Sequence, residues 1–179
     1  MVYERLVGIK KCPIRSQEKW CNDCELENDV TIDWKLVYRL PFNCTEITKL
    51  TTFQFKLLHR RLAINDFLKK IGIKTNDRCS FCEVELENLT HLFWFCTITS
   101  TFWQKFKHWL INDKNFATMQ DTDLTFSIII IGLRPNAFKT KKVHIYFLIA
   151  RYFIWMCRVR DKAPSLEYFS SFVTSFDAS

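Results

Sequence analysis

The sequence predicts a mainly α-helical fold, in which a small Cys-Cys-His-Cys motif lies between amphipathic helices and a C-terminal helical segment follows. Apolar residues recur at spacings of three and four along much of the chain, which is the period of a helix with one buried face. Only 3 Gly and 4 Pro occur in 179 residues, so few positions interrupt a helix. The hydrophobic share of 48% and the aromatic share of 16% exclude a disordered chain and predict a packed core.

The first helix is predicted over residues 46–62, with Thr45 as its N-terminal cap. Its apolar residues follow the helical period: Ile47, Leu50, Phe53, Leu57, Leu58 and Leu62. A second, short helix is expected after Asn65. Gly72 is expected to end it, because glycine adopts the left-handed conformation of a helix C-terminus without strain. Residues 73–82 are predicted to form a loop.

A third helix is predicted over residues 100–111, where aromatic residues recur with helical spacing, and residues 112–123 form a polar connection. Asp123 is placed to cap a short helix that continues to Ile131. The β-branched run at 128–131 suits a buried strand equally well, and periodicity does not decide between the two; we favour the helix.

Two more helices are predicted beyond Pro135. The first spans residues 137–160, and its buried residues include Val143, Phe147, Ile154 and Met156. The last opens at Pro164 and Ser165 and continues through Phe176, because proline is favoured in the first turn of a helix.

Cys79, Cys82, His91 and Cys96 form the pattern Cys-x2-Cys-x8-His-x4-Cys within 18 residues. Two thiolates separated by two residues can approach one ion from a tight turn, and a His and a Cys can complete the tetrahedral shell that zinc prefers. Residues 83–88 are acidic and polar, as an exposed loop between ligand pairs should be. Four protein ligands leave no position for a catalytic water, so the pattern predicts one structural Zn²⁺ in a zinc-knuckle-like site. The alternative, buried thiols and a hydrogen-bonded core histidine, is common for single residues but not for four at this spacing.

The remaining cysteines give weaker signals. Cys12, Cys21, Cys24 and Cys44 could form a second metal site, but their spacings are irregular and no histidine takes part. Cys157 lies in an apolar helical pattern and is predicted to be a core residue.

Nothing near the N-terminus marks the chain for secretion, so we expect reduced thiols and an intracellular location, cytoplasmic or nuclear. The apolar stretches are too short to cross a bilayer, and no membrane association is expected.

The net charge of +7 is unevenly distributed. Residues 31–78 carry 10 basic and 4 acidic side chains, a balance of +6, and residues 139–179 carry 7 and 3, a balance of +4. These basic blocks suit a phosphate backbone or another acidic partner, although ordinary solvated Lys and Arg would give the same count.

The sequence has no Gly-rich phosphate loop, no Gly-x-Ser-x-Gly and no His-Glu-x-x-His, so we expect neither an enzyme nor a small-molecule substrate.

The first basic helix reads Thr48-Lys49-Leu50 and then Phe53-Gln54-Phe55-Lys56-Leu57-Leu58-His59-Arg60. Asn65, Cys79-Ser80-Phe81-Cys82 and Glu87-Asn88-Leu89-Thr90-His91-Leu92-Phe93-Trp94-Phe95-Cys96 follow it. Together these segments resemble the zinc-binding domain of reverse transcriptases from LINE-type non-LTR retrotransposons. The resemblance covers residues 45–110, with similar flanks at 33–42 and 141–164.

The resemblance implies the C-terminal part of a retrotransposon polyprotein, which helps a reverse transcriptase hold element RNA or target DNA. It implies zinc ligands at Cys79, Cys82, His91 and Cys96. It divides the chain into an N-terminal arm that links to a missing polymerase region (1–44), the reverse transcriptase zinc-binding domain (45–112) and a C-terminal helical extension (113–179). The chain has no aromatic-Ala-Asp-Asp motif, so we do not expect it to polymerise or cleave DNA.

Basic side chains near the motif would contact phosphates once zinc fixes the neighbouring helix. They are Lys56, Arg60, Arg61, Lys69, Lys70, Lys74 and Arg78. An exposed aromatic such as Phe81 or Trp94 would stack on an unpaired base, which favours RNA or single-stranded DNA over duplex. For Phe93, Trp94 and Phe95 the favoured alternative is core packing around the metal. The alternative is a protein-interaction module with a purely structural zinc, docked on a polymerase domain from another chain. A large exposed apolar patch over residues 126–176 would indicate that second function.

Overall fold

A computed structural model describes residues 15–24, 32–112, 125–132 and 141–177. Within these ranges the backbone forms helices and turns, and the one β-type contact is an isolated antiparallel bridge between Arg78 and Leu86. The predicted mainly α-helical fold, with the Cys/His motif between helices, is confirmed. Most of the predicted 112–123 connection and the predicted start of the long helix at residue 137 lie outside the described residues.

The described elements follow one another in this order: α2 (Arg15–Asp23), α3 (Trp34–Cys44), α4 (Thr48–Leu58), α5 (Asn65–Lys70), the π-helical turn η1 (His91–Phe95), α6 (Thr97–Asn112), α7 (Phe126–Ile131), α8 (Lys141–Val159) and α9 (Leu166–Asp177). None of the helices in the described ranges has both the length and the apolar character that crossing a bilayer requires.

The helix predicted over 46–62 is α4, which is shorter at both ends. Its N-cap is Ile47 rather than Thr45, whose hydroxyl instead accepts a hydrogen bond from the Ile47 N–H at 3.1 Å. At the other end Arg60 has a left-handed φ of 56°, and the N–H groups of Arg60 and Arg61 donate to carbonyls of the last turn, so the helix ends at Leu58. Glycine is the usual residue at such a stop, so an arginine gives no sequence signal for it.

The other predicted helices are present. α5 is followed by Gly72 with a φ of 76°, as predicted. α7 is a helix rather than a strand, and its cap is Thr125, whose hydroxyl accepts from the Ile128 N–H at 3.3 Å; the predicted cap Asp123 lies outside the described residues. α9 follows Ser165, whose hydroxyl accepts from a first-turn N–H at 3.2 Å.

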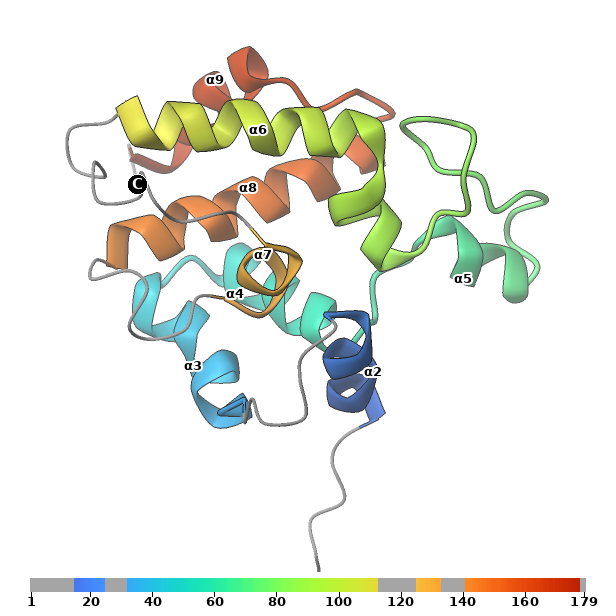
Figure 1. Ribbon diagram of the computed structural model, residues 1–179, viewed down its shortest axis with the longest axis horizontal. Coiled ribbons are helices and arrows are strands. Elements are labelled where there is room, and N and C mark those ends of the chain that lie inside the picture. The colour runs from blue at the N-terminus through green and yellow to red at the C-terminus, as the bar shows by residue number, and fades with distance from the viewer. Residues whose placement is uncertain (1–14, 25–31, 113–124, 133–140, 178–179) are drawn as a thin grey trace, which may run out of the picture.

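The core surrounds α8. Figure 1 shows α8 between α6 and α9 on one side and α3 and α4 on the other, and α8 contacts α3, α4 and α9. Fully buried aromatic side chains fill the space between α6, α8 and α9: Phe102, Trp103, Phe106, Phe147, Phe153 and Phe169. Val143, Phe147 and Ile154 are buried as predicted, whereas Met156 is only half-buried because it faces an open groove.

Two helices precede α4 in a segment to which the sequence analysis assigned none. α2 carries Trp20, which is fully buried and donates its indole N–H to the Leu58 carbonyl at 2.9 Å. The Arg60 guanidinium lies 4.2 Å from the centroid of the same indole ring. α2 therefore packs on the C-terminal end of α4 and supports its unusual stop.

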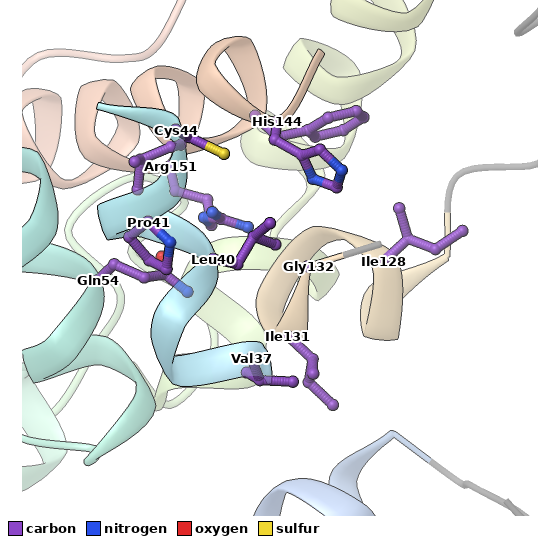
Figure 2. A pocket seen from close by; sticks show the side chains of 12 residues that line it. Val37, Leu40, Pro41, Cys44, Gln54, Ile128, Ile131, Gly132, His144 and Arg151 are labelled. Carbon is purple, nitrogen blue, oxygen red and sulfur yellow. The ribbon is translucent and has the colours of Figure 1, made fainter. Parts of the chain in front are cut away.

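A small cavity of ≈ 10 Å³ lies between α3, α4, α7 and α8 (Figure 2), and it has room for about one water molecule. Arg151, buried in the middle of α8, donates to the Ile129 carbonyl, and Gln54 of α4 donates to the Ile130 carbonyl at 3.1 Å. Both carbonyls belong to the last turn of α7, where backbone acceptors lack helical partners. Arg151 and Gln54 therefore cap α7. Burial lowers the pKa of Arg151 to about 9, so the guanidinium stays charged at neutral pH.

Candidate metal centre

The Cys/His motif lies in a lobe that we define as residues 65–96, which projects from the helical body beside the start of α6 (Figure 1). The ligand atoms of Cys79, Cys82, His91 and Cys96 all lie within 4.8 Å of one another. Cys82 is half-buried and the other three side chains are buried. The structure thus brings the four residues named as ligands into one cluster.

The distances within this cluster match one tetrahedral ion. The Sγ atoms of Cys79 and Cys96 are 3.9 Å apart, and Cys82 Sγ lies 3.3 Å from His91 Nε2. Zn–S bonds of about 2.3 Å and a Zn–N bond of about 2.0 Å place two sulfurs about 3.8 Å apart, and a sulfur and a nitrogen about 3.5 Å apart. A disulfide would need an S–S distance of about 2.05 Å. The cluster therefore fits one structural zinc ion held by four protein donors.

A tight turn presents the first two cysteines. The Glu83 N–H donates to the Cys79 carbonyl at 2.9 Å, and Glu83 has a left-handed φ of 58° that reverses the chain. The Phe81 N–H lies 3.4 Å from Cys79 Sγ. An N–H group directed at a sulfur favours the thiolate, which is the form that binds metal.

The turn η1 brings His91 and Cys96 together. The Cys96 N–H donates to the His91 carbonyl at 2.8 Å, so the turn closes between residues five apart. In an α-helix such residues point roughly 140° apart around the axis, whereas the wider π turn returns them toward the same side. The Trp103 indole of α6 donates to the Phe93 carbonyl at 2.7 Å and so supports the turn from the body.

Cys96 lies immediately before α6, where its surroundings favour the thiolate form of its side chain. The hydrogen bond from Cys79 lowers the pKa of the Cys96 thiol, and the first N–H groups of α6 contribute in the same direction. The same hydrogen bond, together with burial, raises the pKa of Cys79. The two sulfurs therefore share one proton, and a metal ion that binds both must displace it.

Glu87 joins this lobe to α8. It is fully buried, and its Oε1 accepts from Arg158 Nη2 at 2.9 Å and from the Asn65 N–H at 2.8 Å, while its Oε2 accepts from the Ser80 N–H at 2.7 Å. Burial raises the pKa of Glu87, but the hydrogen bonds from Ser80 and Asn65 and the charge of Arg158 outweigh it, so the pKa is lowered. The expectation of a wholly exposed loop at 83–88 is wrong at this residue, because a carboxylate can be buried when an arginine and backbone donors surround it.

The remaining cysteines do not join a second centre in the part of the chain that the structure describes. Cys21, Cys24 and Cys44 are half-buried, and no group of three or more potential ligands other than the one above occurs among the described residues. Cys12 lies outside those residues. Cys157 is buried in the core, as predicted.

The predicted phosphate contacts fall on two places, the C-terminal end of α4 and α5 with the loop after it. Four of the seven residues bind groups of the protein itself: Arg60 pairs with Asp23 at 2.6 Å, Lys69 with Asp77 at 3.0 Å and Lys70 with Asp66 at 2.7 Å, and Arg78 donates to the Val84 carbonyl. Lys56, Arg61 and Lys74 are exposed and form no ion pair with another described residue.

Phe81 is not the freely exposed aromatic that base stacking would need, and Trp94 packs against the core, which is the alternative favoured for it. Both are half-buried and pack against the core, because they flank buried ligands. The most exposed apolar residues of the lobe are Phe67, Ile71, Ile73, Val84, Leu86 and Phe95, at 41% to 68% exposure. Between residues 126 and 176, Val159 is the one large apolar side chain of this exposure among the described residues, so the apolar patch considered for that region is not found there.

The fold and the cluster define a helical domain with a buried centre of three cysteines and one histidine that fits a structural zinc ion. Residues 15–103 match the protein family described as zinc-binding in reverse transcriptase. This segment, which includes α2, α3 and all four cluster residues, belongs to that family. Among curated proteins, none matches the chain.

Proposed function

We propose that the chain is a zinc-stabilised nucleic-acid-binding module derived from the C-terminal part of a LINE-type retrotransposon reverse transcriptase. Cys79, Cys82, His91 and Cys96 hold its zinc ion. The module holds RNA or target DNA and catalyses no reaction itself. One observation carries the proposal: the chain has a zinc centre of the reverse-transcriptase type, and Lys74 of its lobe, like Lys56 and Arg61 before the lobe, forms no ion pair with another described residue.

The zinc ion and Glu87 give that lobe a fixed shape. Zinc ties the turn at 79–82 to η1, and Glu87 ties the same turn to α8. Lys74 in the lobe, and Lys56 and Arg61 at the C-terminal end of α4, form no ion pair with another described residue and can bind phosphates. Lys69 and Lys70 are in exposed ion pairs, which contribute little stability, so phosphates can compete for them.

Zinc content and nucleic-acid affinity measured on one preparation test this proposal. We expect one zinc per chain, lost in Cys79→Ser and Cys82→Ser. Three phosphate contacts on a single strand predict a fall in affinity of roughly 20-fold between about 50 and about 200 mM salt. Replacing Lys56, Arg61 and Lys74 together by Gln should flatten this dependence, whereas Lys35→Gln on α3 serves as the matched exposed control. A chain with zinc that binds no nucleic acid at low salt would refute the proposal.

A second candidate is a protein-interaction module that docks on a polymerase domain of another chain. The exposed apolar residues of the lobe favour it, because exposed apolar groups that lie together mark protein contacts. This module would keep its zinc and its fold. It would bind a reverse transcriptase domain through a surface that Phe67→Ser and Ile73→Ser disrupt, and it would leave RNA and DNA unbound at about 50 mM salt.

A further inference from the structure

We propose that the groove between α4, α8 and α9 binds an unpaired base of single-stranded nucleic acid, with the adjoining phosphate held by cations at its rim; this inference rests on the proposed function. The groove has a volume of ≈ 390 Å³, within the range of small-ligand pockets. Aromatic side chains and two cations from these helices line it: Tyr152, Tyr168, Phe172, Phe176, Lys49 and Arg160. It lies largely in the C-terminal extension, beyond the residues that match the zinc-binding family.

The aromatic rings form a fixed wall with accessible faces. Phe172 lies 5.2 Å from Phe176 and 6.2 Å from Tyr152 between ring centroids. Phe176 is buried, whereas Tyr152, Tyr168 and Phe172 are half-buried, so each of the three keeps surface that faces solvent or the groove. Rings held by their neighbours lose little conformational entropy when a base stacks on them. Stacking on such rings is the main sequence-tolerant contact of single-strand binders.

The two rim cations are positioned without being neutralised. Lys49 Nζ lies 4.3 Å from the centroid of the Phe176 ring, and Arg160 Nη1 donates to the Tyr168 hydroxyl at 2.8 Å. A ring face and a phenol orient these side chains but carry no negative charge, and the described residues that line the groove include no carboxylate. Among these residues neither cation is neutralised, so both can bind a phosphate, for which arginine is a strong hydrogen-bond donor.

The combination of stacking faces and cations favours single-stranded nucleic acid. A base in a duplex is paired and stacked on its neighbours, so only an unpaired base can enter a groove of this size. A wholly apolar peptide segment would leave the two cations without a partner. A single strand satisfies both features at once, because each nucleotide carries a flat base and a phosphate.

The test compares short labelled strands on the zinc-loaded full chain: a single-stranded RNA, its DNA equivalent, a duplex, and the same strand with abasic positions. Phe172→Leu keeps an apolar side chain and removes the ring, and we expect it to weaken binding of the intact single strands about tenfold, the loss of roughly one stacked base. Duplex and abasic strands should be unaffected. Lys49→Gln with Arg160→Gln should weaken every single strand, abasic ones included. Phe42→Leu, at a more exposed phenylalanine on α3 outside the groove, should change nothing.

Crosslinking of 5-iodouracil strands to the unaltered chain supplies a readout that does not depend on a variant folding. Adducts on Tyr168 or Phe172 are expected. Suppose that the unaltered chain binds in a salt-sensitive way, Phe172→Leu loses no affinity, and the adducts are confined to residues 56–78. This result overturns the proposed groove site and leaves the proposed function intact. No binding of any nucleic acid at low salt overturns both. An equal loss for duplex and single strand also overturns the insertion of a base.

Discussion

Among the described side chains of the lobe, Glu87 accepts the most hydrogen bonds. None of its partners is a metal ligand. It receives hydrogen bonds from Ser80, Asn65 and Arg158, and Arg158 Nη2 also donates to Asn65 Oδ1 at 2.7 Å. Each partner is thus fixed by at least one other. Such a network specifies one arrangement of the lobe against α8, because removal of one member leaves buried donors without an acceptor.

Glu87→Gln should therefore destabilise the fold by about 3 kcal/mol, because it leaves the 10%-exposed Arg158 side chain without its counter-charge. Urea unfolding of the zinc-saturated protein measures this. Asp66→Asn is the matched control, since it breaks an exposed pair with Lys70 and should cost less than about 0.5 kcal/mol. Equal costs for the two variants would show that the buried network contributes no more than a surface pair.

The same residue predicts a dependence on pH. The pKa of Glu87 is lowered in the folded state, so its contribution is fully present above the unfolded pKa of about 4.3 and is lost as pH falls through the folded pKa. The stability difference between the native chain and Glu87→Gln should hold at pH 6 and shrink below about pH 4. Unfolding free energies across that range, at saturating zinc, provide the measurement. A difference that grows on acidification would contradict the role of the charge.

The sequence predicted the residues of the cluster but not their surroundings. Cys79, Cys82, His91 and Cys96 could be named because thiolates and imidazoles at short spacing have few other uses in a reduced chain. The pairing of Glu87 with Arg158 joins positions 71 apart, and no local pattern indicates such a contact. A count of charged residues likewise does not predict that Lys69 and Lys70 form ion pairs.

The C-terminal ends of the helices show what the local sequence can and cannot predict. Gly72 was identified because glycine is the usual left-handed residue after a helix. Arg60 adopts the same conformation, and its ion pair with Asp23 and its contact with Trp20 accompany the strained backbone. The π turn η1 also has no composition signal, since its width depends on support from α6.

Gly72→Ala tests the stop of α5 in isolation. A Cβ at this position would meet no atom within 4 Å, so the effect should be the backbone strain of a left-handed alanine alone, about 1 kcal/mol. Asparagine tolerates the left-handed region better, so Gly72→Asn should cost less. Thermal unfolding of the three proteins gives the order. If alanine proves as stable as glycine, α5 does not need the left-handed residue to end.

At the level of the whole molecule, the body and the lobe are held by different forces. The body is filled by interlocking rings such as Phe153 and Phe169, whose centroids are 5.3 Å apart. The lobe has several exposed apolar residues, and its order depends on the predicted zinc ion, on the contacts of η1 with α6, and on Glu87. The aromatic share of the sequence predicted the packed body, and the Cys/His pattern predicted the zinc site of the lobe. The junction between the two depends on contacts between residues distant in sequence, which no local pattern indicates.

Removal of zinc should therefore open the lobe and leave the body folded. After treatment with a chelator, the hydrogen-bonded N–H groups of Cys79, Glu83 and Cys96 should exchange with deuterium more than about 100-fold faster, because metal binding supplies much of the folding energy of such sites. The N–H groups in the middle of α8, near Phe153, should keep their protection, since the rings that pack on Phe153 come from α6 and α9 and include no ligand. Cys82→Ser should reproduce the exchange pattern without chelator. Parallel loss of protection in α8 would mean that the zinc ion holds the whole chain together, and the division into body and lobe would then be wrong.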